Sequence, residues 1–140
     1  MKKLLSPVLI AAILITSLVS CSVTTPGSDV DIDLTMLSST MVYSEVLNML
    51  QNPDEYIGKT VRMEGQFAVT QTEQRNYYQC IIADATACCA NGIEFSRADN
   101  AAFPDDYPPI ETEITVVGRF ETYMEGASTY IEIVDAEMTY

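Results

Sequence analysis

The sequence predicts an all-β domain with a small α contribution: a five-stranded OB-like barrel preceded by a short N-terminal helix. In residues 60–70 and 113–123, apolar side chains alternate with polar ones, as they do in strands that bury one face. Each segment carries a central glycine, Gly65 or Gly118, and a long strand of a small closed barrel needs such a residue where it coils. A five- or six-stranded antiparallel sandwich is the alternative fold.

The N-terminus predicts export from the cytoplasm. The chain begins with a methionine and two lysines, which are followed by an apolar segment at residues 4–19. This segment is short for a membrane span, and the order of basic and apolar residues is typical of a secretory signal peptide, which we place at residues 1–20. The motif Leu18-Val19-Ser20-Cys21 resembles the bacterial lipobox. That resemblance implies acylation of Cys21 and an extracytoplasmic protein that is lipid-anchored to the bacterial cell membrane. The alternatives are an uncleaved N-terminal anchor and an ordinary signal peptide.

Residues 21–40 are predicted to form the lipidated cysteine and a flexible tether, because Ser, Thr, Gly and Asp dominate them without a sustained period. The OB-like domain is placed at residues 41–140. We expect it to begin with a helix within residues 41–51, where apolar residues recur at helical spacing (Val42, Val46, Met49 and Leu50).

Residues 77–95 are predicted to form a hairpin that holds three of the four cysteines. Tyr78, Cys80 and Ile82 share one face of the first strand, and the intervening residues share the other. A turn begins at Asp84, and a second short strand begins at Gly92. The last predicted strand covers residues 129–135, after a glycine-containing hairpin loop.

Charge and composition exclude several functions. The chain has 7 basic and 20 acidic residues and a net charge of −13, and removal of residues 1–20 with their two lysines makes it −15. Such a surface repels polyphosphates, so we expect no nucleic-acid partner. There is no histidine, which excludes Ser-His and Cys-His catalysis and imidazole metal ligation.

A family resemblance covers roughly residues 43–135. The run Tyr56-Ile57-Gly58-Lys59-Thr60-Val61, continued by Gly65-Gln66-Phe67, resembles the entry to an OB-like domain of bacterial surface proteins. It is similar to the C-terminal domain of an uncharacterised family of permease partners, which is often encoded beside metal-uptake genes. Cys88-Cys89-Ala90 resembles the paired cysteines of that family, although the family's Asp and Cys-Cys elements come in a different order. The resemblance implies an OB-like fold and a metal role for Cys88 and Cys89.

The three thiols Cys80, Cys88 and Cys89 have three interpretations. A bridge from Cys80 to Cys88 or Cys89 would close a loop of about ten residues, which stabilises a protein by up to about 3 kcal/mol. Alternatively, the three thiolates bind Zn²⁺ or Cu(I), with a carboxylate or water in the fourth position. In the third interpretation they are small buried side chains. We expect the bridge, because an extracytoplasmic compartment favours oxidation.

No catalytic constellation is found in the sequence, so we expect a protein that is not an enzyme. Asp105-Asp106 lacks the alternating oxygen ligands of a calcium loop and is interpreted as a solvated acidic loop. Tyr77, Tyr78 and Tyr107 are candidates for a ligand-stacking face, with packing as the alternative.

Two functions therefore compete. The first is a non-enzymatic binding or accessory module on the membrane, associated with a transporter or with zinc handling. The second is a structural or protein-interaction lipoprotein of the envelope, which has a disulfide-stabilised hairpin and no small ligand.

Overall fold

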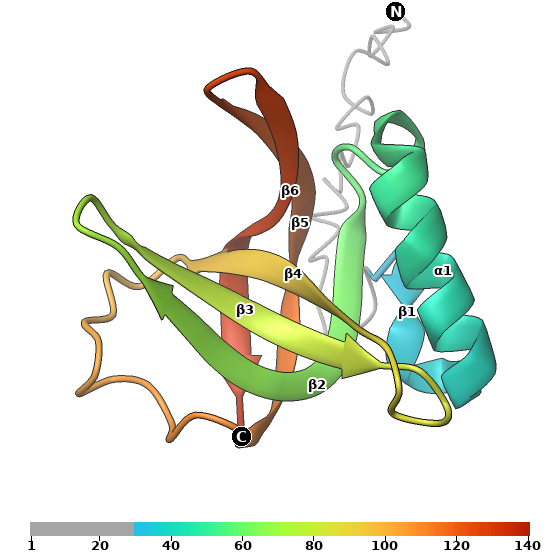
Figure 1. Cartoon of the computed structure of the whole chain (residues 1–140), viewed down its shortest axis with the longest axis horizontal. Coiled ribbons are helices and arrows are strands. Elements are labelled where there is room, and N and C mark those ends of the chain that lie inside the picture. The colour runs from blue at the N-terminus through green and yellow to red at the C-terminus, as the bar shows by residue number, and fades with distance from the viewer. Residues whose placement is uncertain (1–29) are drawn as a thin grey trace, which may run out of the picture.

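The structure is a computed structural model that describes residues 30–140, so the predicted signal peptide and the predicted lipidation site Cys21 lie outside the described part. The described part is mostly β, with one α-helix and two 3₁₀ helices (Figure 1). The strands are β1 (Ile32–Asp33), β2 (Thr60–Gln71), β3 (Asn76–Ala83), β4 (Ala90–Arg97), β5 (Glu113–Glu125) and β6 (Ser128–Thr139). The helices are η1 (Leu34–Met36), α1 (Ser39–Gln51) and η2 (Pro53–Glu55). The predicted all-β class with a helix near its start is confirmed, but the strands number six and not five.

The additional strand, β1, lies within the predicted tether. Its two residues pair in parallel with Val61 and Arg62 of β2, and the adjacent Leu34 is only 1% exposed. Asp33 accepts hydrogen bonds from Thr35 and forms an ion pair of 2.9 Å with Arg62. The folded domain thus begins before the predicted boundary at residue 41. Two alternating residues are too few for a strand pattern to be recognised in a polar segment.

The last strand of the sheet order pairs back with the second one. The order is β1-β2-β3-β4-β6-β5, and β5 also pairs antiparallel with β2 over Thr60–Gln66. The pair β4–β6 is parallel, whereas β2–β3, β3–β4 and β5–β6 are antiparallel. Antiparallel neighbours need only a short turn, but the parallel pair needs the long connection through residues 98–112 and β5.

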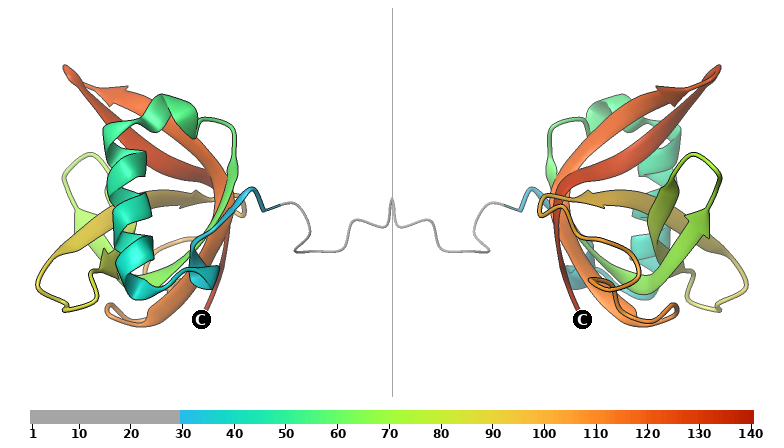
Figure 2. Two further views of the ribbon diagram at one scale, coloured as in Figure 1. Left: turned by 90° about the vertical axis from the view of Figure 1, so that its right-hand side faces the viewer. Right: turned by 90° about the vertical axis from the view of Figure 1, so that its left-hand side faces the viewer.

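The core lies between the concave face of the sheet and α1, which runs along one side of the molecule (Figure 2). Its largest fully buried side chains come from four strands (β2, β4, β5 and β6), η1 and α1: Phe67, Phe95, Phe120, Leu34, Met49, Met63, Ile93, Ile114, Ile133, Val46, Val61 and Val116. The helix contributes Val46 and Met49, as its spacing predicts, while Leu50 stays 38% exposed. Within the described residues, no helix is long and apolar enough to span a membrane.

Gly65 and Gly118 are required by close contacts where the long strands bend. A Cβ on Gly65 would lie 2.4 Å from the backbone oxygen of Ile81 and 2.9 Å from the Cys80 sulfur. A Cβ on Gly118 would lie 2.7 Å from the oxygen of Val134, and the β5–β6 register shifts next to it. The prediction that both strands bend at these glycines therefore has a steric basis.

Replacement of Gly65 by alanine is expected to destabilise the domain by about 1–3 kcal/mol, because the new methyl group meets backbone that cannot move aside. Chemical denaturation measures the difference in unfolding free energy. Gln66→Ala is the matched control, since Gln66 is the exposed neighbour and its loss should change stability by less than about 0.5 kcal/mol. Equal stability of the two variants would contradict the steric argument.

Candidate metal centre

The loop between β3 and β4 is organised by one carboxylate. The backbone N–H of Asp84 donates to the Cys89 carbonyl at 2.8 Å, which closes the loop. Asp84 Oδ1 accepts from the N–H of Thr86, the hydroxyl of Thr86 and the N–H of Cys88, each at 3.0 Å. Ala87 adopts a left-handed φ of 54°, so the chain reverses tightly and returns both cysteines to Asp84.

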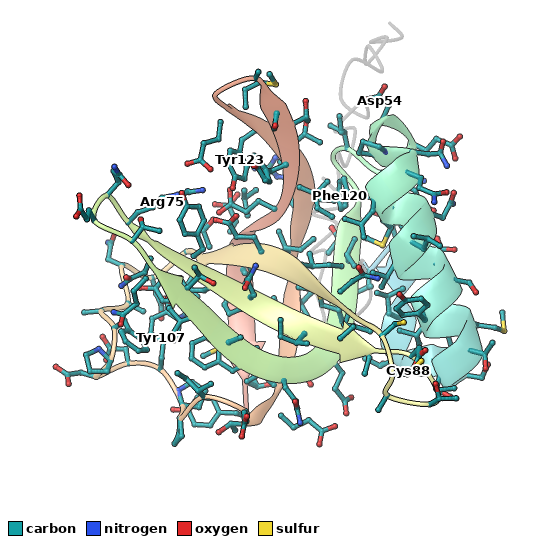
Figure 3. All side chains as sticks on the ribbon, viewed as in Figure 1. Asp54, Arg75, Cys88, Tyr107, Phe120 and Tyr123 are labelled. Atoms are coloured by element: carbon teal, nitrogen blue, oxygen red, sulfur yellow. The ribbon has the colours of Figure 1, made fainter. Side chains whose placement is uncertain are left out.

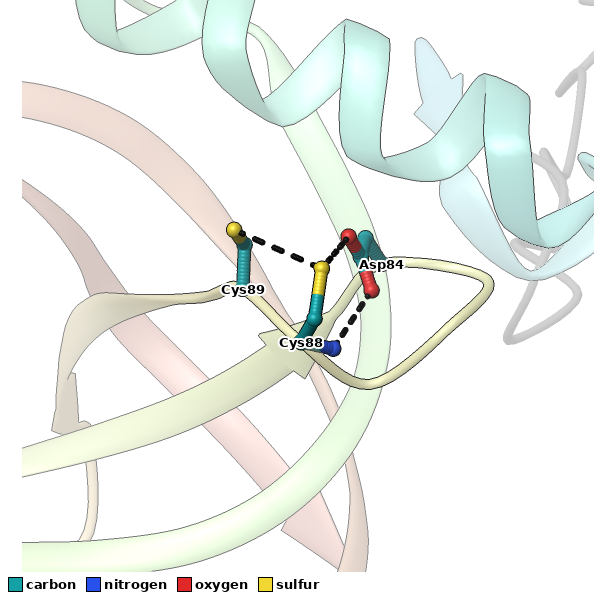
Figure 4. A group of neighbouring side chains, drawn as sticks. All are labelled: Asp84, Cys88 and Cys89. Carbon is teal, nitrogen blue, oxygen red and sulfur yellow. Dashed lines mark hydrogen bonds between the residues drawn. The ribbon is translucent and has the colours of Figure 1, made fainter.

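This turn gathers three metal-ligating groups. The Cys88 thiol donates to Asp84 Oδ2 at 3.1 Å, and its sulfur lies 3.8 Å from that of Cys89 (Figure 4). The potential ligand atoms of Asp84, Cys88 and Cys89 all lie within 4.8 Å of one another. A divalent ion with bonds of about 2.0–2.3 Å to sulfur and oxygen needs ligand atoms at such separations.

The electrostatics of the loop favour a charged Asp84 carboxylate beside a protonated Cys89 thiol. The hydrogen bond from Cys88 is the largest influence that lowers the pKa of Asp84, followed by the bonds from Thr86. The pKa of Cys89 is raised, first by its hydrogen bond with Cys88 and then by burial and the charge of Asp84, while Tyr43 of α1 acts in the opposite direction. A metal ion that bound here would therefore displace at least one thiol proton.

Cys80 lies elsewhere, so the predicted bridge from Cys80 to Cys88 or Cys89 is wrong for this structure. It is fully buried and faces the core between its register partners, Phe67 of β2 and Ile93 of β4. All three thiols of the described residues are free, and Cys88 and Cys89 are exposed. The three-thiolate metal site is wrong for the same reason. Burial, then the charge of Glu64, raises the pKa of Cys80 to about 12, so this cysteine has the packing role.

The structure predicts two classes of thiol reactivity. In the folded, reduced Cys21→Ala chain, Cys88 and Cys89 should react with a thiol reagent at neutral pH, whereas Cys80 should react only after unfolding, because it is buried and protonated. The absorbance of the released chromophore should rise in two phases: two thiols react in the folded protein, and one more reacts after denaturant is added. If the same chain, kept unreduced and then unfolded, exposed only one reactive thiol in total, the Cys80 bridge would be supported instead.

The three candidate tyrosines do not share one face. Tyr78 and Tyr107 stack on each other with ring centroids 4.3 Å apart, and both contact Phe67 at the edge of the core. Tyr77 lies on the opposite face of β3, where its hydroxyl donates to Glu125 at 2.7 Å. Alternation along the strand predicts this separation of Tyr77 from Tyr78, so the proposed grouping of the three tyrosines is wrong.

Asp84 and Asp106, which lie in different loops, have different roles. From the sequence alone, Asp84 is interpreted as a turn residue, and its order relative to Cys88-Cys89 enters the family resemblance, but it is not proposed as a ligand. An aspartate four positions before a Cys-Cys pair, across a tight turn, is the signal that could have identified it. Asp106 of the proline-rich loop accepts from the Ala102 N–H at 2.9 Å and so stabilises that loop.

Comparisons with known proteins identify no relatives: no family model matches this chain, and neither curated proteins nor solved structures give a match.

Proposed function

We propose that this protein is a non-enzymatic, lipid-anchored module on the extracytoplasmic side of a bacterial membrane, which binds a zinc ion through Asp84, Cys88 and Cys89. The observation that carries the proposal is the convergence of one carboxylate and two exposed thiols within 4.8 Å in a loop held by its own hydrogen bonds. The signal sequence and Cys21 supply the anchor, by the lipobox resemblance.

The scaffold is proposed to be an OB-like barrel. Support comes from the sequence of pairings β2–β3–β4–β6–β5, which returns to β2 through seven residue pairs. The parallel β4–β6 pair and the bends at Gly65 and Gly118 also agree with this fold. In such a scaffold the β3–β4 loop presents the metal ligands between two rigid strands.

The ligand set favours Zn²⁺. Zinc accepts cysteine sulfur together with aspartate oxygen, whereas Cu(I) selects soft sulfur ligands and Ca²⁺ or Mg²⁺ select oxygen alone. Two sulfurs and one oxygen therefore fit zinc better than the other ions. Tetrahedral zinc needs a fourth ligand, and the exposure of both cysteines leaves that position open to water or to a group from another molecule.

An open position suits transfer of the ion rather than permanent structural binding. Closed sites of four protein ligands hold zinc as part of the fold, while a three-ligand site can exchange a ligand with a partner. The loop is already closed by backbone and Asp84 hydrogen bonds, so the fold does not depend on the ion. We therefore place the protein beside a membrane transporter or envelope protein that receives or supplies zinc.

The proposal is tested on protein isolated from membranes under reducing conditions. We expect one zinc per chain by elemental analysis, with recovery after chelation and addition of zinc. Cys21→Ala should move the protein from the membrane to the soluble fraction or halt its processing. Membrane attachment with no zinc, even at high added concentration, would favour an interaction lipoprotein without a small ligand. Normal processing and attachment of Cys21→Ala would show that the apolar segment is the anchor.

A further inference from the structure

A second polar cluster lies away from the thiol loop, on the outer face of the sheet. We call the following residues the tyrosine–glutamate face: Tyr77 of β3, Glu94 of β4, Glu121 and Tyr123 of β5, and Tyr130 and Glu132 of β6. Figure 3 shows Arg75 and Tyr123 close together and well separated from Cys88. The proposed zinc site uses none of these residues.

The face has more negative charge than its own cations neutralise. Glu132 is the register partner of both Glu94 on β4 and Glu121 on β5, so three carboxylates occupy neighbouring positions on adjacent strands. Like charges in such positions repel. Arg75 pairs with Glu94 at 3.2 Å and Arg119 pairs with Glu121, but Glu132 has no ion-pair partner among residues 30–140.

Arg75 shows which chemistry the tyrosines accept. Its guanidinium carbon lies 4.1 Å from the ring centroid of Tyr77 and 5.0 Å from that of Tyr123. Its Nη2 donates to the Tyr123 hydroxyl at 2.7 Å, and that hydroxyl donates to Glu94 at 2.6 Å. Aromatic faces with a nearby carboxylate thus already hold one guanidinium.

Next to this arrangement, an open cavity of about 410 Å³ lies between Glu94, Tyr130 and the end of α1. Tyr130 stacks on Tyr123 with a centroid distance of 5.6 Å and stays 45% exposed. Leu50 and Ile131 supply an apolar wall. The cavity therefore combines an aromatic ring, an anion and an apolar surface. The charged group of an arginine or lysine contacts aromatic rings and anions, and its alkyl stem packs on apolar surface.

We propose that the tyrosine–glutamate face binds a basic segment of a partner protein, with an arginine or lysine side chain in the cavity between Tyr130 and Glu94, next to Glu132. Glu94 and the partly open ring of Tyr130 line the cavity, and the unpaired charge of Glu132, the register partner of Glu94, adds to the negative charge there. The net charge of −13 would steer a cationic segment toward this protein. Binding at this face requires neither the metal nor the lipid.

The test uses the full chain in a neutral detergent and the peptide acetyl-Gly-Arg-Gly-Arg-Gly-amide, with the glutamine analogue as its neutral counterpart. Isothermal titration should detect the arginine peptide and not the glutamine peptide. The double variant Tyr130→Ala, Glu132→Gln should weaken binding by about tenfold, because both the aromatic and the ionic contact are removed. Tyr130→Phe should retain binding, because the ring remains.

Asp105→Asn removes one charge from an exposed loop outside the face and is the matched control, with an expected change of less than about twofold. Circular dichroism establishes that each variant is folded. If Glu132→Gln and Asp105→Asn weaken binding equally, the attraction depends on net charge alone and the proposed face is overturned. Failure of the arginine peptide to bind the wild-type chain overturns it as well.

Discussion

Replacement of either Cys88 or Cys89 by serine is expected to reduce zinc affinity by at least about 100-fold. Even outer-shell partners of metal ligands change affinity by about 10–100-fold, and these two cysteines would bind the ion directly. Competition titration with a chromophoric chelator measures the affinities. Cys80→Ala is the matched control, since it removes a thiol that lies in the core and away from the loop.

Asp84→Asn separates the two roles of the carboxylate. The amide oxygen can still accept the N–H groups of Thr86 and Cys88, so the turn should persist while the charge is lost. We expect a loss of zinc affinity of about tenfold or more with an unchanged unfolding curve. Wild-type affinity in all three ligand variants would refute the site, and an effect of Cys80→Ala equal to theirs would move the site to the core.

The sign of the pH dependence follows from the thiols. Since the pKa of Cys89 is raised, this thiol is protonated around neutral pH, and zinc must displace the proton. Affinity is therefore expected to fall as pH is lowered and to rise toward the thiol pKa. The pKa of Asp84 is lowered, so the carboxylate stays charged throughout that range.

Truncation of Phe67 to alanine is expected to produce the largest loss of stability, about 3–5 kcal/mol. Phe67 is fully buried, and its ring lies 5.5 Å from Tyr107 and 6.4 Å from both Phe95 and Tyr78. Alanine would leave a cavity at the centre of this aromatic cluster, which spans β2, β3, β4 and the 98–112 loop. Because domains of this size are stable by only about 5–15 kcal/mol, the variant should be close to unfolding at 37 °C.

Thermal unfolding followed by circular dichroism measures this effect, and the midpoint should fall by more than about 10 °C. Phe67→Leu keeps most of the volume and should lose less than about 1.5 kcal/mol. Met36→Ala is the surface control, since Met36 is 81% exposed. A loss for Phe67→Ala no greater than that of Met36→Ala would mean that the aromatic cluster is not packed as described.

The local features of this fold could be predicted from the sequence because they depend on residues close in the chain. Alternation identified the faces of β2 and β5, and the glycines at 65 and 118 identified where both strands bend. Helical spacing found α1 within two residues of its start. Both β1 and the adjacent η1 were missed within the predicted tether, because a strand of two residues is held by its pairing to β2 and a helix of three residues has no pattern of its own.

The tertiary structure alone decided which partners meet. Alternation placed Cys80 with Tyr78 on one face, but whether that face is buried depends on the core that the other elements pack against it. Cys88 and Cys89 were expected near Cys80, yet the turn at Asp84 directs them away from the core and toward its own carboxylate. Likewise, Glu94 and Glu132 are 38 positions apart and become neighbours only through the parallel β4–β6 pair. A periodic pattern specifies a face within one element, whereas contacts between elements depend on chain closure over long loops, which no local pattern encodes.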